Sequence, residues 1–284
     1  GVSAQASENG EVNIAVTSGN NLTAGKAVDI AALNAPAVKA VTGALSGSLL
    51  ASAAVTVAQA NIGTKGKALK TSVTIGDNNV LAAETISVKA ETNAKQDVDM
   101  QALSISASPF PGGAAQINSG GSSIYSDVTV DAGSNVYRGK ALGGNNYGAA
   151  DLLLEAGNSV SQKVRASGIS AGTAFATGTN LAATQAVLTT KVTAAGSKAG
   201  SHINDLTVNA KSYAAIDSEA NGYGGALIDI SPYAAKVENE YRADTDVELS
   251  GDWTTDGVVT AGAINGSDID LHADAVRAAV VGGS

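Results

Sequence analysis

The sequence predicts an all-β protein, a right-handed parallel β-helix (a β-solenoid) built from about five imperfect repeats. Two observations predict it: a short alternating phrase returns along the chain, and Gly/Asn turn signals separate strand-like runs. The phrase is an aliphatic residue, a spacer, a second aliphatic residue, a second spacer and alanine, and it occurs at 28–32, 86–90, 152–156, 206–210 and 269–273. Successive first residues are 58, 66, 54 and 63 apart, which indicates a repeat array rather than a coiled coil or collagen.

Each phrase predicts one half-buried strand. Because side chains alternate along a strand, the two aliphatic residues and the alanine share one face and the spacers share the other. In the fourth phrase this places Val208 in the core and Asn209 at the surface. An alanine at the third position of every copy indicates a narrow interior, in which the next coil leaves room for little more than a methyl group.

The turns and the remaining strands follow from the segments between the phrases. Gly and Asn tolerate positive φ, and they predict corners at 19–21, 76–79, 133–135, 144–146, 157–158 and 178–180. A second strand-like run follows each phrase, at 53–57, 114–117, 180–184 and 226–230, and a third leads into the next phrase, at 72–75, 127–130, 191–193 and 246–249. One copy is therefore two or three coils, or one broad coil with projecting hairpins.

Composition predicts one elongated domain over residues 1–284. Hydrophobic residues make up 44% of the chain but aromatic residues only 4%, so a thin stacked core fits better than a large globular one. The formal charge is −9 and the basic residues are scattered, which argues against nucleic acid and anionic lipid as partners. The absence of cysteine excludes disulfides and thiolate chemistry and fits a protein exported unfolded.

An uncharged stretch at 40–64 raises the alternative of a membrane-spanning helix. Small polar residues dilute its hydrophobicity. The matching segment of the next copy carries Lys95, Asp97, Asp99 and the Pro109 and Pro111 break, which a spanning helix would not accept. A buried limb of the repeat is the better interpretation, and we expect no membrane span in this segment.

Catalytic chemistry finds little support in the sequence. The two histidines, His202 and His272, lie in different copies, so neither a catalytic triad nor a histidine metal site is expected, and no cofactor is expected either. Carboxylates two residues apart on one strand face suggest weak calcium sites. These carboxylates belong to Asp244, Asp246, Glu248, Asp268 and Asp270. The alternative is that they form an acidic surface that keeps the protein soluble.

Two further ideas concern sugars. Parallel β-helices host polysaccharide lyases and hydrolases, but the acidic residues here are spread over several copies and form no local cluster. Tyrosines recur at ten-residue spacing, at Tyr213, Tyr223 and Tyr233 and again at Tyr137 and Tyr147. They are interpreted either as a strip that binds glycans or as caps at the corners of a thin core.

The succession of these segments also resembles a known family. The runs at 28–32, 41–48, 53–57, 75–78 and 86–90 resemble repeats of very large leukotoxin-type filamentous adhesins, and 20–30 is similar to a coil of the filamentous-haemagglutinin repeat. The Pro109 and Pro111 limb and the segment with Tyr223, Tyr233 and Tyr241 depart from that pattern. The resemblance implies a parallel β-helix in a secreted bacterial surface protein, with adhesion to host or neighbouring cells and, in some members, toxicity to leukocytes.

The expected function is therefore a non-enzymatic structural or adhesive segment of a long extracellular filament, contacting a surface receptor or glycan. The alternatives are a polysaccharide lyase or hydrolase and a leukocyte-directed toxin segment. We also expect the chain to be part of a longer array, because it opens at Gly1 in mid-copy without a signal segment. Its ends are then expected to associate end to end, less so when Val280 and Val281 are changed to Lys.

Overall fold

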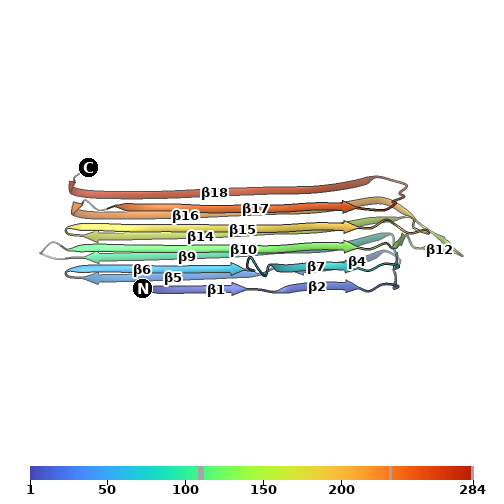
Figure 1. Ribbon diagram of the computed structural model, residues 1–284, viewed down its shortest axis with the longest axis horizontal. Coiled ribbons are helices and arrows are strands. Elements are labelled where there is room, and N and C mark those ends of the chain that lie inside the picture. The colour runs from blue at the N-terminus through green and yellow to red at the C-terminus, as the bar shows by residue number, and fades with distance from the viewer. Residues whose placement is uncertain (108–111, 230–231, 283–284) are drawn as a thin grey trace.

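The protein is all-β with parallel sheets. The computed structural model describes residues 1–107, 112–229 and 232–282, and within these ranges it contains strands and no helix (Figure 1). Every pairing between long strands is parallel, and a short hairpin formed by β12 (Ala141–Gly143) and β13 (Asn146–Tyr147) is antiparallel. Since none of the described segments is helical, no helix is available to cross a membrane.

Two large sheets and one small sheet make up the structure. Sheet 1 has seven strands: β1 (Val2–Glu8), β2 (Glu11–Val16), β6 (Ala51–Ile62), β7 (Leu69–Ile75), β10 (Gly113–Ala132), β15 (Phe175–Ala194) and β17 (Tyr233–Leu249). Sheet 2 has six: β4 (Ala27–Asn34), β5 (Ala37–Ser48), β9 (Thr85–Ser106), β14 (Ala150–Gly172), β16 (Ile203–Asp229) and β18 (Val259–Gly282). The edge sheet has three: β3 (Asn21–Thr23), β8 (Val80–Ala82) and β11 (Val136–Arg138).

The chain visits these sheets in a repeating circuit. It runs out along sheet 2, turns, returns along sheet 1 and enters sheet 2 again beside its previous pass (Figure 1). On the first three returns from sheet 1 it passes through a strand of the edge sheet, β3, β8 or β11, and on the last two it does not. Each circuit is a single broad one, and the hairpin β12–β13 projects from the longest. The second and third runs of a copy merge into one strand in β10 and β15, whereas the predicted run at 226–230 begins inside β16.

Register confirms four of the five phrases and corrects the fifth. Val28, Ile86, Leu152 and Leu206 are neighbours across sheet 2. Beside Leu206, however, lies Val259, so the last circuit spans 53 residues rather than 63. The fifth phrase, at 269–273, pairs ten residues further along the strand, with 216–220. Aliphatic residues and spacers alternate in the fifth phrase as they do in the other four. The ten-residue offset is visible only in the pairing between β16 and β18.

The core consists of two clusters between the sheets. One lies beside the edge sheet and is rich in branched aliphatics, and the other lies midway along the strands. The phrase alanines Ala32, Ala90, Ala156 and Ala210 are all at most 1% exposed, as the narrow interior requires. Alternation along the strands is confirmed as well, because Val208 is fully buried while Asn209 is only half-buried.

Part of the interior is polar, which the sequence did not predict. The predicted corners at 157–158 and 178–180 lie within β14 and β15, where Asn158 and Asn180 are buried. Asn118 Nδ2 donates to Asn180 Oδ1 over 2.6 Å and to the carbonyl of Ser167 over 2.8 Å. Buried amides are tolerated where they bond to one another and to backbone carbonyls. This stacked arrangement therefore allows asparagine inside a strand.

The remaining predicted corners do lie outside the long strands. At 19–21, 76–79 and 133–135 the chain leaves sheet 1 for the edge sheet, and 144–146 is the tip of the hairpin. The uncharged segment 40–64 lies chiefly in β5 and β6. Pro109 and Pro111, and the side chains of Val280 and Val281, lie outside the described residues.

Candidate functional site

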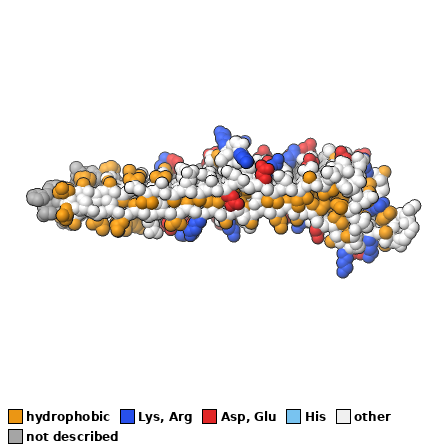
Figure 2. All heavy atoms as spheres, turned by 90° about the horizontal axis from the view of Figure 1, so that it is seen from below, with side chains coloured by type: hydrophobic (Ala, Val, Ile, Leu, Met, Phe, Trp, Pro, Cys, Tyr) orange, Lys and Arg blue, Asp and Glu red, His pale blue; other side chains and the backbone are white. Residues whose placement is uncertain are grey.

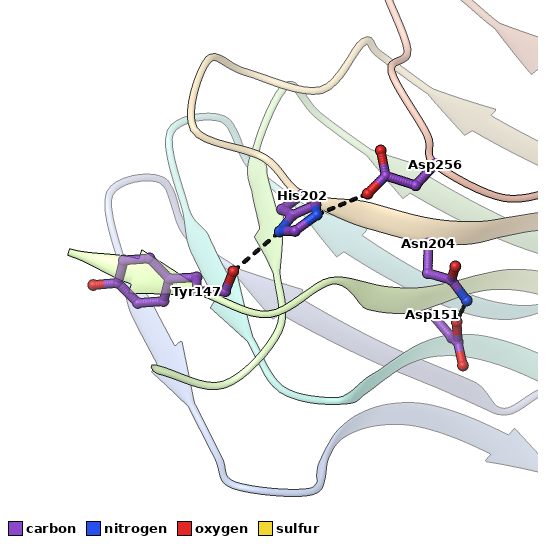
Figure 3. Close-up of polar contacts among 5 residues, drawn as sticks. All are labelled: Tyr147, Asp151, His202, Asn204 and Asp256. Carbon is purple, nitrogen blue, oxygen red and sulfur yellow. Dashed lines mark hydrogen bonds and ion pairs between the residues drawn. The ribbon is translucent and has the colours of Figure 1, made fainter. Parts of the chain in front are cut away.

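His202 lies at the outer edge of the structure, near the hairpin (Figure 3). Its Nδ1 is 3.0 Å from the carbonyl oxygen of Tyr147, and its Nε2 is 2.8 Å from Asp256 Oδ2. Beside it, Asn204 Nδ2 donates to Asp151 Oδ1 over 2.8 Å. The ring therefore bridges the hairpin and the loop that leads into β18.

Both ring nitrogens of His202 face acceptors, which defines its chemistry. A carbonyl oxygen only accepts, so Nδ1 carries a proton, and a second proton on Nε2 completes the bond to Asp256. The bond to the Tyr147 carbonyl, followed by that to Asp256, raises the pKa of His202. A general base needs a free nitrogen directed at its substrate, whereas both nitrogens of His202 face acceptors of the protein itself.

The hairpin has a second attachment on its other side. The Arg138 guanidinium carbon lies 3.4 Å from the centroid of the Tyr147 ring, a cation–π contact. Tyr137, the residue before Arg138, is fully buried and stacks on Trp253 with ring centroids 6.1 Å apart. Burial raises the pKa of Tyr137 to about 12, so its hydroxyl is neutral at physiological pH.

The candidate calcium ligands lie apart from one another. Asp244, Asp246 and Glu248 are on the outer face of β17, where Lys191 Nζ lies 3.4 Å from Asp246 and 2.9 Å from Glu248. The lysine ammonium thus occupies the place where a cation would bind. Within the described ranges, no group of three or more His, Asp or Glu side chains is arranged to hold a metal ion.

The second acidic pair lies on β18. Asp268 and Asp270 stand beside Ala215 and Asp217 of β16, and Asp217 pairs with Lys163 over 2.9 Å. His272 lies on the same strand, 3.4 Å from Asp274. These side chains are on an exposed strand face and do not converge on an enclosed site.

The ten-residue tyrosine spacing does not produce one strip. Tyr213 and Tyr223 are exposed on the outer face of β16, at 45% and 46%. Tyr233 belongs to sheet 1 instead and points inward, where its hydroxyl accepts from Gln116 Nε2 over 2.7 Å and donates to the Gly168 carbonyl over 3.1 Å. The ten-residue spacing thus crosses from one sheet to the other, because Tyr223 lies on β16 and Tyr233 on β17.

A polar depression on the outer face of sheet 1 is the site that sequence reasoning missed. It is open, encloses about 490 Å³, and its floor includes Gly121 and Ala183. The bordering polar side chains come from four neighbouring strands; they are Gln59, Asn61, Ser123, Gln185, Glu238 and Glu240. We call this set the polar depression.

Hydrogen bonds between neighbouring side chains orient the residues of the polar depression. Tyr125 Oη donates to Gln185 Oε1 over 2.6 Å, and Gln185 Nε2 donates to Glu240 Oε2 over 2.6 Å. Ser123 Oγ donates to Asn61 Oδ1 over 2.7 Å. The result is a surface of oriented amide, hydroxyl and carboxylate groups. Its residues are about 60 positions apart in sequence, and no local motif marks them.

Comparisons of this chain with protein families, with curated proteins and with solved structures gave no match.

Proposed function

We propose that this chain is a repeat section of a right-handed parallel β-helix, serving as a non-enzymatic structural and adhesive segment of a long secreted bacterial surface filament. The observation that carries the proposal is the unbroken in-register stack of circuits across sheet 2, from β4 and β5 to β18. A stack of this kind can be lengthened by adding circuits without changing the contacts of those already present.

Cross-strand ion pairs support the structural half of this proposal. Lys39 pairs with Asp97 over 3.2 Å and Lys211 with Glu155 over 2.6 Å, each between adjacent strands of sheet 2. Exposed pairs contribute only modestly to stability. Lys39 and Asp97 are directly opposite, and Lys211 and Glu155 are diagonal neighbours. Both arrangements favour the native register over a slipped one, because a slip by one residue moves every side chain to the other face.

The polar depression supports the adhesive half. Carboxylate and amide groups that already bond to one another are oriented before a ligand arrives, which lowers the entropic cost of binding. A hydroxyl-rich ligand such as a surface glycan can both donate to Glu240 and accept from Gln185. The depression is open, so it can accept one part of a long chain rather than a whole small molecule.

Binding to immobilised glycans tests this function. We expect the intact chain to bind a subset of surface glycans, and Gln185→Ala with Glu240→Ala to lose that binding. Thr193→Ala, on the outer face of the same sheet but away from the depression, is the matched control. Loss of binding in the control as well, or no binding by the intact chain to glycans or cells, would contradict the adhesive role.

A second assay addresses catalysis. We expect the chain to release no product from acidic polysaccharides, with or without calcium. Reproducible turnover that a single Asp substitution abolishes would replace the adhesive proposal with that of an enzyme.

A further inference from the structure

Charge is segregated along the first four passes of the chain from sheet 2 to sheet 1, whereas on β18 Asp274 and Arg277 lie on either side of Val276. Residues 40–64, 100–126 and 166–190 contain no Asp, Glu, Lys or Arg, and 220–235 contains only Asp229. Each run covers the part of a circuit that contains the turn from sheet 2 to sheet 1. Figure 2 shows the consequence from below: hydrophobic side chains run along the whole length of the molecule, whereas charged ones appear over its middle and right and not at its left end.

Sheet 2 carries one continuous apolar row on its outer face, which lies in the uncharged part of four strands and extends onto β18. The row crosses five adjacent strands, β5, β9, β14, β16 and β18, with one residue from each in direct register. We call it the apolar row; its members are Leu45, Leu103, Ile169, Tyr223 and Val276. Leu45 is 77% exposed and Ile169 48%. Such a row is unfavourable in water unless something covers it.

Small residues flank the apolar row on β5 and β14, and a groove lies beside it. Gly43 and Ser167 lie two positions before the row, and Gly47 and Ala171 two positions after it. On β9 the flanking residues are larger, Gln101 before the row and Ile105 after it. The groove encloses about 500 Å³ and is lined by residues of the row together with Gly43, Gln101 and Ser167. A ridge of large side chains beside a furrow is the surface that two sheets need to interlock.

The charged part of the same face begins directly beyond the small residues. The next row contains Asp99, Arg165 and Glu219, and Arg165 Nε lies 3.5 Å from Glu219. A partner lying on the apolar row is thus bounded on one side by charges. With a formal net charge of −9, copies of the chain repel one another except where they meet through the uncharged part.

We propose that the apolar row is a lateral docking surface for a second copy of this chain, the two copies lying face to face through sheet 2. The row repeats with the strand spacing of about 4.8 Å, and another copy presents rows of the same spacing, so ridge and furrow match along the whole contact. The uncharged face measures about 26 by 19 Å, since it spans about eight residues along four strands. That area of roughly 500 Å² is below the roughly 800 Å² per partner of a stable interface and corresponds to a weak, reversible contact.

A two-fold axis that lies between the two faces, along the apolar row, satisfies this contact. In such a pair each copy uses the same patch, and the charged parts of the two copies point in opposite directions, away from each other. Each residue of the row then lies near the axis and faces its own counterpart, as Ile169 of β14 does. This pairing would bundle neighbouring filaments side by side and is independent of any contact between chain ends.

Sedimentation velocity of the chain over a range of concentrations tests the proposal. We expect a reversible dimer, and Leu45→Lys with Ile169→Lys should weaken it about tenfold or more, because two ammonium groups would be buried without partners. Leu33→Lys with Ile264→Lys is the matched control: both residues are exposed aliphatics on the outer face of sheet 2, but in its charged part. That pair should leave the dimer unchanged.

Cross-linking identifies the surface itself. The chain has no cysteine, so Ile169→Cys and Ile264→Cys each introduce a single thiol. A short bis-maleimide should join two copies through position 169 and not through position 264. Equal cross-linking at both positions, a monomer at every concentration, or association that ignores the Leu45 and Ile169 changes would overturn the proposal. So would binding of the uncharged part to neutral lipid vesicles in place of self-association.

Discussion

His202 Nε2 faces Asp256 Oδ2 across 2.8 Å, while the other ring nitrogen faces the carbonyl of Tyr147. One protonated side chain thus holds together a hairpin and a loop that belong to different circuits. A neutral imidazole carries a single N–H and cannot donate to both acceptors. The attachment of the hairpin is therefore linked to pH.

We predict that this attachment weakens as the pH rises. The pKa of His202 is raised in the folded protein, so the stabilisation is fully present below the unperturbed value of about 6.5 and is lost as the pH passes through the folded pKa. Amide hydrogen exchange in the hairpin β12–β13 should then accelerate beyond the ordinary pH effect, relative to amides of β14. NMR titration in a His272→Gln background reports His202 alone.

Asp256→Asn is the control for this effect. It removes the carboxylate, so the pKa of His202 should fall and hairpin exchange should be faster even at low pH. Nearby carboxylates of Asp151 and Asp205 are bonded to Asn204 and to the Val258 amide, respectively, and remain in place. An unchanged titration in Asp256→Asn would show that the Tyr147 carbonyl alone holds the imidazolium.

The alternation of sheet 2 makes a second prediction. Val208 is fully buried and Asn209 beside it is half-buried on the outer face. Val208→Asp should lower the free energy of unfolding by roughly 3 kcal/mol or more, because it buries an unpaired charge. Asn209→Asp should change it by less than about 1 kcal/mol. Denaturant melts of the two variants, compared at equal pH, measure the difference, and equal losses would mean that the side chains do not alternate as described.

Features of the fold and of the candidate site could be predicted from the sequence where they depend on neighbouring residues, and not where they depend on residues far apart along the chain. The phrases at 86–90 and 152–156 were predicted because alternation is a local property of five residues. The offset at Val259 and the polar depression were not, because Gln185 and Glu240 become neighbours only through a register 55 residues apart. Asn180 was predicted to lie in a turn because asparagine is common in turns. In the structure its buried side chain accepts a hydrogen bond from Asn118, and this contact outweighs the turn preference.

A third prediction concerns the corner asparagines. Asn79 is fully buried; its side-chain Oδ1 accepts from the Asn20 backbone N–H over 2.8 Å, and its Nδ2 donates to the Gly76 carbonyl over 2.6 Å. Asn79→Ala leaves the Asn20 amide without this acceptor and should cost about 1 to 3 kcal/mol. Asn78→Gly is the neighbouring control, since Asn78 has a φ of 63°, which glycine adopts readily. A calorimetric Tm lowered equally in both variants would contradict the specific role of the Asn79 side chain.

The last prediction concerns the space around Tyr233. Gly222 faces the interior, and a methyl group there would overlap the Tyr233 ring and come within 2.6 Å of Asn180 Nδ2, whereas a methyl group at Gly121 would meet open space. Neither glycine has a positive φ. Both changes to alanine therefore have similar backbone effects and differ in packing. Gly222→Ala should destabilise the protein by about 1 to 3 kcal/mol, and Gly121→Ala should be neutral or slightly stabilising.

A double-mutant cycle separates this overlap from a general intolerance of position 222. If the Tyr233 ring is the obstacle, Tyr233→Ala removes it, and the added methyl group then occupies part of the vacated space. The double variant should therefore lose less stability in denaturant melts than the two single changes together, by about 1 kcal/mol or more. Strict additivity would mean that the methyl group collides with something other than the ring, and that the glycines at this end of the sheets do not accommodate Tyr233.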